Sequence, residues 1–459
     1  MTIRARIDRL ARNKMLRSIG VLVGGTMFAH VITAISLPVL TRLYSPADFS
    51  VLAMFASTLA IISVASCLRF DVAIAIPAQD VEAANLLVLA MACAAIVSTL
   101  VAAVALVLPN SVLHAFHQSA LIPWLALLPL GVLLAGGYSA LQMWFVRRKR
   151  FSAIASSRVL QSAAASGVQV GMGWMHWTPG GLLLGQLLNT GAGVTSLAYR
   201  FARHDRDALV GVSWAGMRSA WAAYDRFPKY STLEALANSA SIQLPIILIA
   251  ALAPGAEAGF LVLAMAALQA PMGLIGTAVS QVYLSRAPDE ERGGRLGAFT
   301  TKLFGGLVRT GVGPLLFTGF VAPGAFAFVF GAEWRRAGEL VTWMAPWFVM
   351  QFLASPVSMA LHITGHQRAA FVLQIFGLLF RTAAVLLASR VAMGFISEAY
   401  ALSGFVFYAI YLATVLRVAR ANASSVLNEI RRNAAMLVLW TAGGFATARL
   451  IDFVAGFIR

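Results

Sequence analysis

The sequence predicts an all-α polytopic membrane protein with about 12 transmembrane helices in two parallel-repeat six-helix bundles. Three observations predict this fold. Long apolar runs alternate with short polar breaks, positive charge gathers at alternate breaks, and a short motif recurs about half a chain later. Each run is long enough to cross a bilayer, because a helix rises 1.5 Å per residue and the hydrocarbon core is about 30 Å thick.

The composition excludes a soluble protein. Of the 459 residues, 59% are hydrophobic and 12% are charged, and the mean hydropathy is +0.79, whereas soluble domains carry about 25% charged residues. The net charge of +17 does not indicate a nucleic-acid partner, because the 35 Lys and Arg residues stand mostly at the ends of apolar runs. Cys67 and Cys93 fall inside apolar runs, so we expect neither a disulfide framework nor a metal site.

The apolar runs divide the chain into five segments. These are a basic N-terminal segment (1–18), a first six-helix bundle (19–199), a cytoplasmic linker (200–230), a second six-helix bundle (231–416) and a basic segment with an apolar helix (417–459). The expected spans are 19–40, 48–69, 84–108, 121–145, 153–174, 179–199, 231–252, 258–284, 301–320, 340–361, 369–389 and 399–416.

The two ends of the chain need separate treatment. The first run, 19–40, is longer than the 7 to 15 residues that are typical of a cleaved signal peptide, so we expect it to remain as the first span. The last run, 434–457, contains Arg449 and Asp452 on one helical face. It is either a thirteenth span or an interfacial helix, and the sequence leaves both readings open.

Positive charge predicts the orientation of the spans. If the basic N-terminus is cytoplasmic, the inner breaks carry most of the Lys and Arg residues, including the run 147–150 and the linker 200–230. The outer breaks hold only Arg42, Arg335, Arg336 and Arg390. The positive-inside rule predicts this asymmetry, and the opposite orientation fits badly.

A short motif indicates an internal repeat. Residues 49–54 read FSVLAM and residues 260–265 read FLVLAM, with five matches in six positions at an offset of 211. Upstream, Leu37-Pro38 has a counterpart in Leu244-Pro245. The offset covers six spans, an even number, so both halves point the same way through the membrane. Transporters with such parallel repeats bind their substrate between the halves.

Three arginines inside apolar runs are candidate substrate-binding residues: Arg158, Arg309 and Arg381. An arginine near the middle of a membrane costs roughly 2.5 to 3.5 kcal/mol, and a water-filled cavity removes most of that penalty. A cavity lined by guanidinium groups attracts phosphate or carboxylate. The alternative for Arg158 is that its side chain extends to the nearby inner surface.

Two carboxylates near span ends, Asp71 and Glu234, are candidates for ion coupling. Each has a structural alternative. Asp71 is two residues from Arg69 and would pair with it, and Glu234 favours the N-terminus of its own helix.

Six segments resemble the Wzx-type polysaccharide flippases of the multidrug, oligosaccharidyl-lipid and polysaccharide exporter superfamily. They are LPVLTRLYSPADFSVL (37–52), LRFDVAIAIP (68–77), VRRKRFSAIASSRVLQS (146–162), FPKYSTLEALANSASIQLPIILIA (227–250), PMGLIGTAVSQVYL (271–284) and FGAEWRRAGELVTWMAPWFVMQFLASP (330–356). The segments follow the order of the family and cover most of the chain. One departure is Ser50, where members commonly have glycine.

The resemblance implies twelve helices, a central cationic cavity and a location in the bacterial inner membrane. It also implies that the protein moves an undecaprenyl-diphosphate-linked oligosaccharide from the inner to the outer leaflet by alternating access, for lipopolysaccharide or exopolysaccharide synthesis. A polysaccharide polymerase and a chain-length regulator would be its protein partners. Arg158, Arg309 and Arg381 would contact the anionic headgroup, although no family motif fixes them individually.

Two alternatives remain. A drug or ion antiporter of the same superfamily would favour an acidic cavity, and a membrane glycosyltransferase or ligase would need a large outer loop. The longest outer loop, 321–338, is short, so we do not expect an enzyme. The chain contains no G-x-x-x-x-G-K-[ST] sequence, so we expect neither ATP hydrolysis nor a cofactor.

Overall fold

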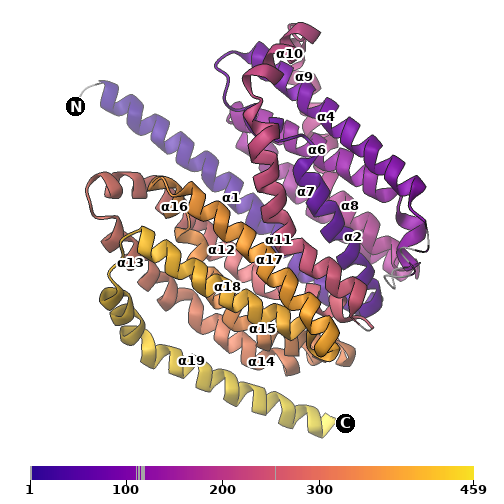
Figure 1. Ribbon diagram of the computed structural model, residues 1–459, viewed down its shortest axis with the longest axis vertical. Coiled ribbons are helices and arrows are strands. Elements are labelled where there is room, and N and C mark those ends of the chain that lie inside the picture. Colours follow the sequence, from indigo (N-terminus) through magenta and orange to yellow (C-terminus); the bar gives the residue numbers. More distant parts are fainter. Residues whose placement is uncertain (1–2, 110, 112–113, 115–118, 254, 459) are drawn as a thin grey trace. The chain divides into compact units, whose positions relative to one another are not determined.

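The computed structural model describes all residues except 1–2, 110, 112–113, 115–118, 254 and 459, and the described chain is helical without strands (Figure 1). It forms two compact units. Unit 1 comprises Met1–Tyr44 and Met54–Gln243, and unit 2 comprises Ser45–Ala53 and Leu244–Arg459. The boundary between Gln243 and Leu244 falls inside a helix, after the linker that the sequence suggests as the division.

Unit 1 holds the first six expected spans. Their helices are α1 (Ile3–Leu43), α2 (Pro46–Ala65), α4 (Asp80–Val107), α6 (Leu127–Arg147), α7 (Phe151–Trp174) and the pair α8 (Gly180–Gly191) and α9 (Gly193–His204). The first residues of α2 belong to unit 2. Shorter elements lie in the connections: α3 (Phe70–Ala73), η1 (Ser119–Trp124), η2 (Arg206–Leu209), α10 (Trp214–Ala223) and η3 (Phe227–Ser231).

Unit 2 holds the remaining spans and the C-terminal helix. The boundary between the units lies within α11 (Thr232–Leu252). The other long helices are α12 (Glu257–Arg292), α13 (Leu296–Leu307), α14 (Gly313–Val329), α15 (Arg335–Ala354), α17 (Gln367–Val391), α18 (Ile396–Val418) and α19 (Ala423–Ile458). Short elements are η4 (Val308–Val312), η5 (Ala332–Trp334), η6 (Ser355–Val357), α16 (Ala360–Ile363) and η7 (Met393–Phe395).

The described residues contain 10 helical segments that are long and apolar enough to cross a membrane. Three further expected spans coincide with helices outside that set. Polar residues such as Arg158 and Gln161 lower the hydropathy of α7, and a break at Ala192 divides the sixth span into α8 and α9. The eighth expected span lies within α12. The predicted class, an all-α polytopic membrane protein, is confirmed.

Three helix pairings recur in the two units, as a parallel repeat predicts. In unit 1, α4 packs on α6, α7 on α8, and α6 on α8. The corresponding helices of unit 2 show the same three pairings: α14 with α15, α17 with α18, and α15 with α18. Pro38 lies inside α1 and its counterpart Pro245 lies inside α11.

The two copies of the repeated motif meet at one tryptophan of unit 2. Trp334 is fully buried. Phe49 and Phe260, the first residues of the two copies, both pack edge-on against it, with ring centres at 4.9 and 5.9 Å. Gly259 lets the segments approach, because a Cβ atom there would lie 2.0 Å from the carbonyl oxygen of Pro46.

The C-terminal helix α19 lies beside the ninth span and runs in the same direction (Figure 1). Its contacts advance along both segments in the same order: Gly305 beside Glu429, Gly313 beside Trp440, and Gly444 beside Phe317. Residues Ala423–Ile451 are also long and apolar enough to span the membrane. This parallel register favours a thirteenth span over an interfacial helix.

Candidate substrate- and ion-binding residues

Arg158 of α7 points to α1 within unit 1. Its Nη1 donates a hydrogen bond of 2.8 Å to Oγ1 of Thr26. The helices approach closely here, because a Cβ atom on Gly25 would lie 2.7 Å from Cβ of Ala155. Polar residues of the first and fifth spans therefore meet here, and the half-buried guanidinium is held at the contact of the two helices.

Arg381 of α17 is enclosed by aromatic rings inside unit 2. Its side chain is 1% exposed, and its Nη2 donates a hydrogen bond of 2.7 Å to Oη of Tyr400. Its Cζ lies 4.6 Å from the ring centre of Trp347 and 4.7 Å from that of Tyr400. Ring faces stabilise a cation by about 0.5 to 2 kcal/mol each. Helices α15 and α18 thus hold this buried charge in one orientation.

Arg309 lies in the π-helical turn η4 between α13 and α14, and it is exposed. Pro314 follows at the start of α14 and has no backbone N–H for the regular helical hydrogen bond. In this region the backbone hydrogen bonds follow the wider π-helical pattern. Such turns occur frequently at functional sites, where they reorient a side chain.

The three arginines therefore differ in environment. Arg158 has a hydroxyl partner in unit 1, Arg381 has an aromatic enclosure in unit 2, and Arg309 is exposed in unit 2. Their part in substrate binding stays a prediction.

Asp71 lies in the short helix α3, and its side chain is buried. Oγ of Ser139 donates a hydrogen bond to its Oδ2. Its Oδ1 is buried without a hydrogen-bond partner among the described residues. The alternative pairing with Arg69 is not seen, since no ion pair joins the two in the described structure.

Glu234 has a different environment. It is exposed in the first turn of α11. This is the position that its structural alternative, a carboxylate at the N-terminus of its own helix, predicts. The described residues contain no group of three His, Cys, Asp or Glu side chains that could hold a metal ion. Ion coupling by Asp71 or Glu234 stays a prediction.

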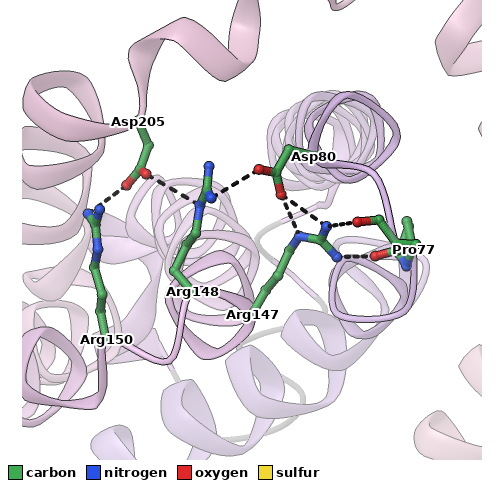
Figure 2. Close-up of polar contacts among 7 residues, drawn as sticks. Pro77, Asp80, Arg147, Arg148, Arg150 and Asp205 are labelled. Carbon is green, nitrogen blue, oxygen red and sulfur yellow. Dashed lines mark hydrogen bonds and ion pairs between the residues drawn. The ribbon is translucent and has the colours of Figure 1, made fainter.

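An ion network joins three connections at one end of unit 1 (Figure 2). Arg147 and Arg148 both contact the carboxylate of Asp80 at 3.0 Å. Arg148 also reaches Asp205 at 3.4 Å, and Arg150 contacts Asp205 at 2.8 Å. The arginine-rich break between the fourth and fifth spans thereby binds the start of α4 to the end of α9.

A second network joins three helix starts within unit 2. Nη2 of Arg336, in the first turn of α15, lies 2.7 Å from Glu257 and 2.7 Å from Glu398. Glu257 begins α12, and Glu398 is a buried residue in the first turn of α18. Sequence reasoning missed both networks because the paired residues are 55 to 79 positions apart, and spacing carries no signal over such distances.

A comparison with known protein families identifies the family to which this chain is related. Residues 39–339 match the model of a family described as polysaccharide biosynthesis protein. The chain belongs to this family. A search of curated proteins found no match to this chain.

Several solved structures share the fold of this chain. The lipid II flippase MurJ, in an inward closed conformation, is 12% identical, with a TM-score of 0.69 over 95% of this chain and 99% of that chain. An inward-facing multidrug resistance MATE transporter of the MOP superfamily is 14% identical, with a TM-score of 0.56 over 87% and 94%. A MOP superfamily transporter from Pyrococcus furiosus is 13% identical, with a TM-score of 0.52 over 88% and 96%.

The family match agrees with the resemblance to proteins of polysaccharide synthesis, and the solved structures show that the fold is one that flippases and transporters share. The protein is a multi-pass membrane protein with a fold of the transporter and flippase type.

Proposed function

We propose that this protein is a flippase that moves an undecaprenyl-diphosphate-linked oligosaccharide from the inner to the outer leaflet of the bacterial inner membrane. The observation that carries the proposal is the combination of the family match with the fold shared with a lipid II flippase. Transport by alternating access would serve polysaccharide biosynthesis, including lipopolysaccharide or exopolysaccharide. The N-terminus would be cytoplasmic, and a polymerase and a chain-length regulator would act on the same pathway.

The diphosphate headgroup is the part of the substrate that Arg158, Arg309 and Arg381 would bind. A guanidinium donates two parallel hydrogen bonds to phosphate oxygens, which a lysine ammonium does not reproduce. Exposed Arg309 offers its donors directly. Arg158 would exchange its bond to Thr26 for a phosphate oxygen. Arg381, fixed between two rings, would contribute mainly its positive field.

Asp71 would couple transport to an ion, because an unpaired carboxylate oxygen in an apolar core is costly as an anion. A proton or a monovalent cation would remove that cost. Asp71→Asn should abolish the dependence of transport on the proton or sodium gradient while the protein still folds. Glu234→Gln is the matched variant at the exposed carboxylate. Gradient dependence that survives both changes would exclude these two residues from coupling.

Gene deletion tests the proposed function directly. Cells without this protein should accumulate undecaprenyl-linked repeat units in the inner leaflet and lose surface polysaccharide, and a plasmid copy should restore both. In proteoliposomes, the purified protein should make a fluorescent undecaprenyl-diphosphate sugar accessible on the opposite leaflet. Unaltered polysaccharide after deletion, together with no transfer in proteoliposomes, would overturn the proposal.

A drug or ion antiporter is the second candidate, and the MATE matches support it. The same proteoliposomes discriminate, since an antiporter would exchange a cationic dye against protons or sodium and leave the lipid-linked sugar in place.

A further inference from the structure

The linker between the sixth and seventh spans contains a helix that is too short to cross a membrane. α10 has 10 residues, which corresponds to about 15 Å. α9 ends at His204, and the next span begins at Phe227. Because spans flank the linker on both sides, α10 stays close to the membrane surface. In the proposed topology this surface is cytoplasmic.

Contacts at both ends of α10 fix the face that it turns toward α4. At its start, the backbone N–H of Ser213 donates a 3.1 Å hydrogen bond to Oδ1 of Asn85. Gly216 allows this approach, because a Cβ atom there would lie 2.5 Å from the same oxygen. At its end, the hydroxyl of Tyr224 donates to Glu82 at 3.1 Å. Ala220, between these contacts, is buried.

The other face of α10 carries two tryptophans and an arginine. Trp214 is 79% exposed and Trp221 is 43% exposed, and Arg218 between them is also exposed. The spacing of four and then three residues places all three on one side of the helix. Val210, just before the helix, is 86% exposed. The contacts to α4 leave Trp214 and Arg218 uncovered. Trp221 packs on the buried Phe70 of α3, with 5.1 Å between ring centres, and still exposes 43% of its surface on the same side of the helix.

The charge of the linker complements an anionic surface. Residues 200–230 contain six Lys and Arg residues against three Asp residues. Asp205 is already engaged by Arg148 and Arg150 (Figure 2), and Asp225 by Lys229. Two of the three linker carboxylates are therefore paired with other cations, and the linker as a whole keeps an excess of positive charge.

We propose that this stripe, formed by Trp214, Arg218 and Trp221, is a docking surface for the anionic phospholipids of the cytoplasmic leaflet. Tryptophan favours the membrane–water interface, where its ring lies among acyl chains and its N–H remains hydrated. Arginine is attracted to the negative surface potential of that leaflet. A soluble protein partner fits less well, because the spans that flank α10 keep this helix at the membrane surface. The proposal concerns a surface outside the candidate substrate-binding residues, and its test needs no transport activity.

A fluorescent label on α10 tests the proposal in the full-length protein. Cys67 and Cys93 are buried, so a cysteine introduced at the exposed Ala222 can be labelled selectively with an environment-sensitive dye. The protein is placed in nanodiscs with one copy each, containing phosphatidylcholine with increasing phosphatidylglycerol. Quenching by a lipid-borne quencher should increase with the phosphatidylglycerol fraction.

Variants separate the two parts of the stripe. Trp214→Ser with Trp221→Ser should reduce quenching at every lipid composition. Arg218→Ala should raise the phosphatidylglycerol fraction needed for half-maximal quenching by about fivefold, while Arg218→Lys should leave it nearly unchanged. Arg431→Ala, which removes an exposed charge elsewhere, is the control. Trp214→Ser alone keeps the contact of Trp221 with the buried Phe70, so it should reduce quenching without a change in packing. Size-exclusion profiles of the variants should match the parent protein.

Several outcomes would overturn the proposal. Quenching that does not depend on phosphatidylglycerol, or that survives the tryptophan changes, would exclude an anionic lipid surface. A dye response that appears only with two copies per disc would identify a second copy of the chain as the occupant. A response to soluble glycerol phosphate without lipid would identify a headgroup site instead of a surface.

Discussion

Arg381 and Trp347 form a cation–π pair inside unit 2, with 4.6 Å between the guanidinium carbon and the ring centre. Tyr400 contacts the same guanidinium through its ring and its hydroxyl. The charge therefore connects three helices, α15, α17 and α18. Arg381 has a structural role that can be tested separately from its proposed role in binding.

Replacement of Arg381 should affect stability as well as transport. We expect Arg381→Ala to lower the free energy of unfolding by about 2 to 4 kcal/mol, because the aromatic contacts and the hydrogen bond are lost together. Arg381→Lys keeps the charge but loses the planar stacking, so its loss should be smaller. Thermal unfolding in detergent and polysaccharide complementation are the two measurements. Unfolding temperatures equal to that of the parent protein in both variants would contradict the structural role.

Arg309 should behave differently because it is exposed on the π turn. We expect Arg309→Ala to reduce transport at least tenfold with a stability change within about 0.5 kcal/mol, as for ordinary exposed positions. Arg309→Lys should recover only part of the activity, since an ammonium lacks the paired donors. Thr310→Ala, at the neighbouring exposed position, is the control. Full transport by Arg309→Ala would remove this residue from the proposed mechanism.

Asp205 should be important for the stability of unit 1. Its carboxylate is buried and contacts Arg148 and Arg150. Breaking a buried ion pair costs about 3 to 5 kcal/mol, but both arginines are partly exposed, so we expect Asp205→Asn to cost about 1 to 3 kcal/mol. A double-mutant cycle with Arg150→Ala should show a coupling energy. Additive effects, or an equal loss in the control Asp207→Asn, would show that the pairing contributes little.

Tyr224 should anchor the linker over the whole physiological pH range. Burial, together with its hydrogen bond to Glu82, raises the pKa of this phenol above its ordinary value of 10. The stability from a raised pKa is fully present below the ordinary pKa and is lost as pH rises through the native one. Tyr224→Phe should therefore cost about 1 kcal/mol equally at pH 7 and pH 9. Tyr230→Phe, at an exposed tyrosine, is the control; a loss that changed between these pH values would contradict the assignment.

The C-terminus should lie on the opposite side of the membrane from the N-terminus. α19 crosses beside the ninth span in the same direction, which adds a thirteenth crossing to the twelve of the two bundles. Alkaline phosphatase fused to the full-length chain should be active, whereas a fusion after Ala421 should be inactive. Inactivity of both fusions would mean that α19 lies on the inner surface and does not cross the membrane.

The sequence predicted the spans well, because apolar runs of this length have one stable arrangement in a membrane. It also identified Arg158 as a charge inside an apolar run, while its partner Thr26 is seen only in the structure. The break at Ala192 was not predicted, since a run rich in glycine and leucine reads as one continuous span.

The ion networks escaped prediction for another reason. Arg147 to Arg150 were interpreted as topological charge, and nothing in the spacing indicates that Asp80 and Asp205 neutralise part of it. The aromatic enclosure of Arg381 was likewise hidden, because Trp347 and Tyr400 look like ordinary apolar residues within their spans. The periodicity of a sequence indicates which side chains share a helix face. Contacts between helices that are distant in the sequence are seen only in the structure.

The convergence of Phe49 and Phe260 on Trp334 couples the two copies of the repeated motif. The two phenylalanines share one contact, so a substitution of either one alters the environment of the other. Homologues should therefore show compensating replacements among these three aromatic positions, while the remainder of each copy drifts apart.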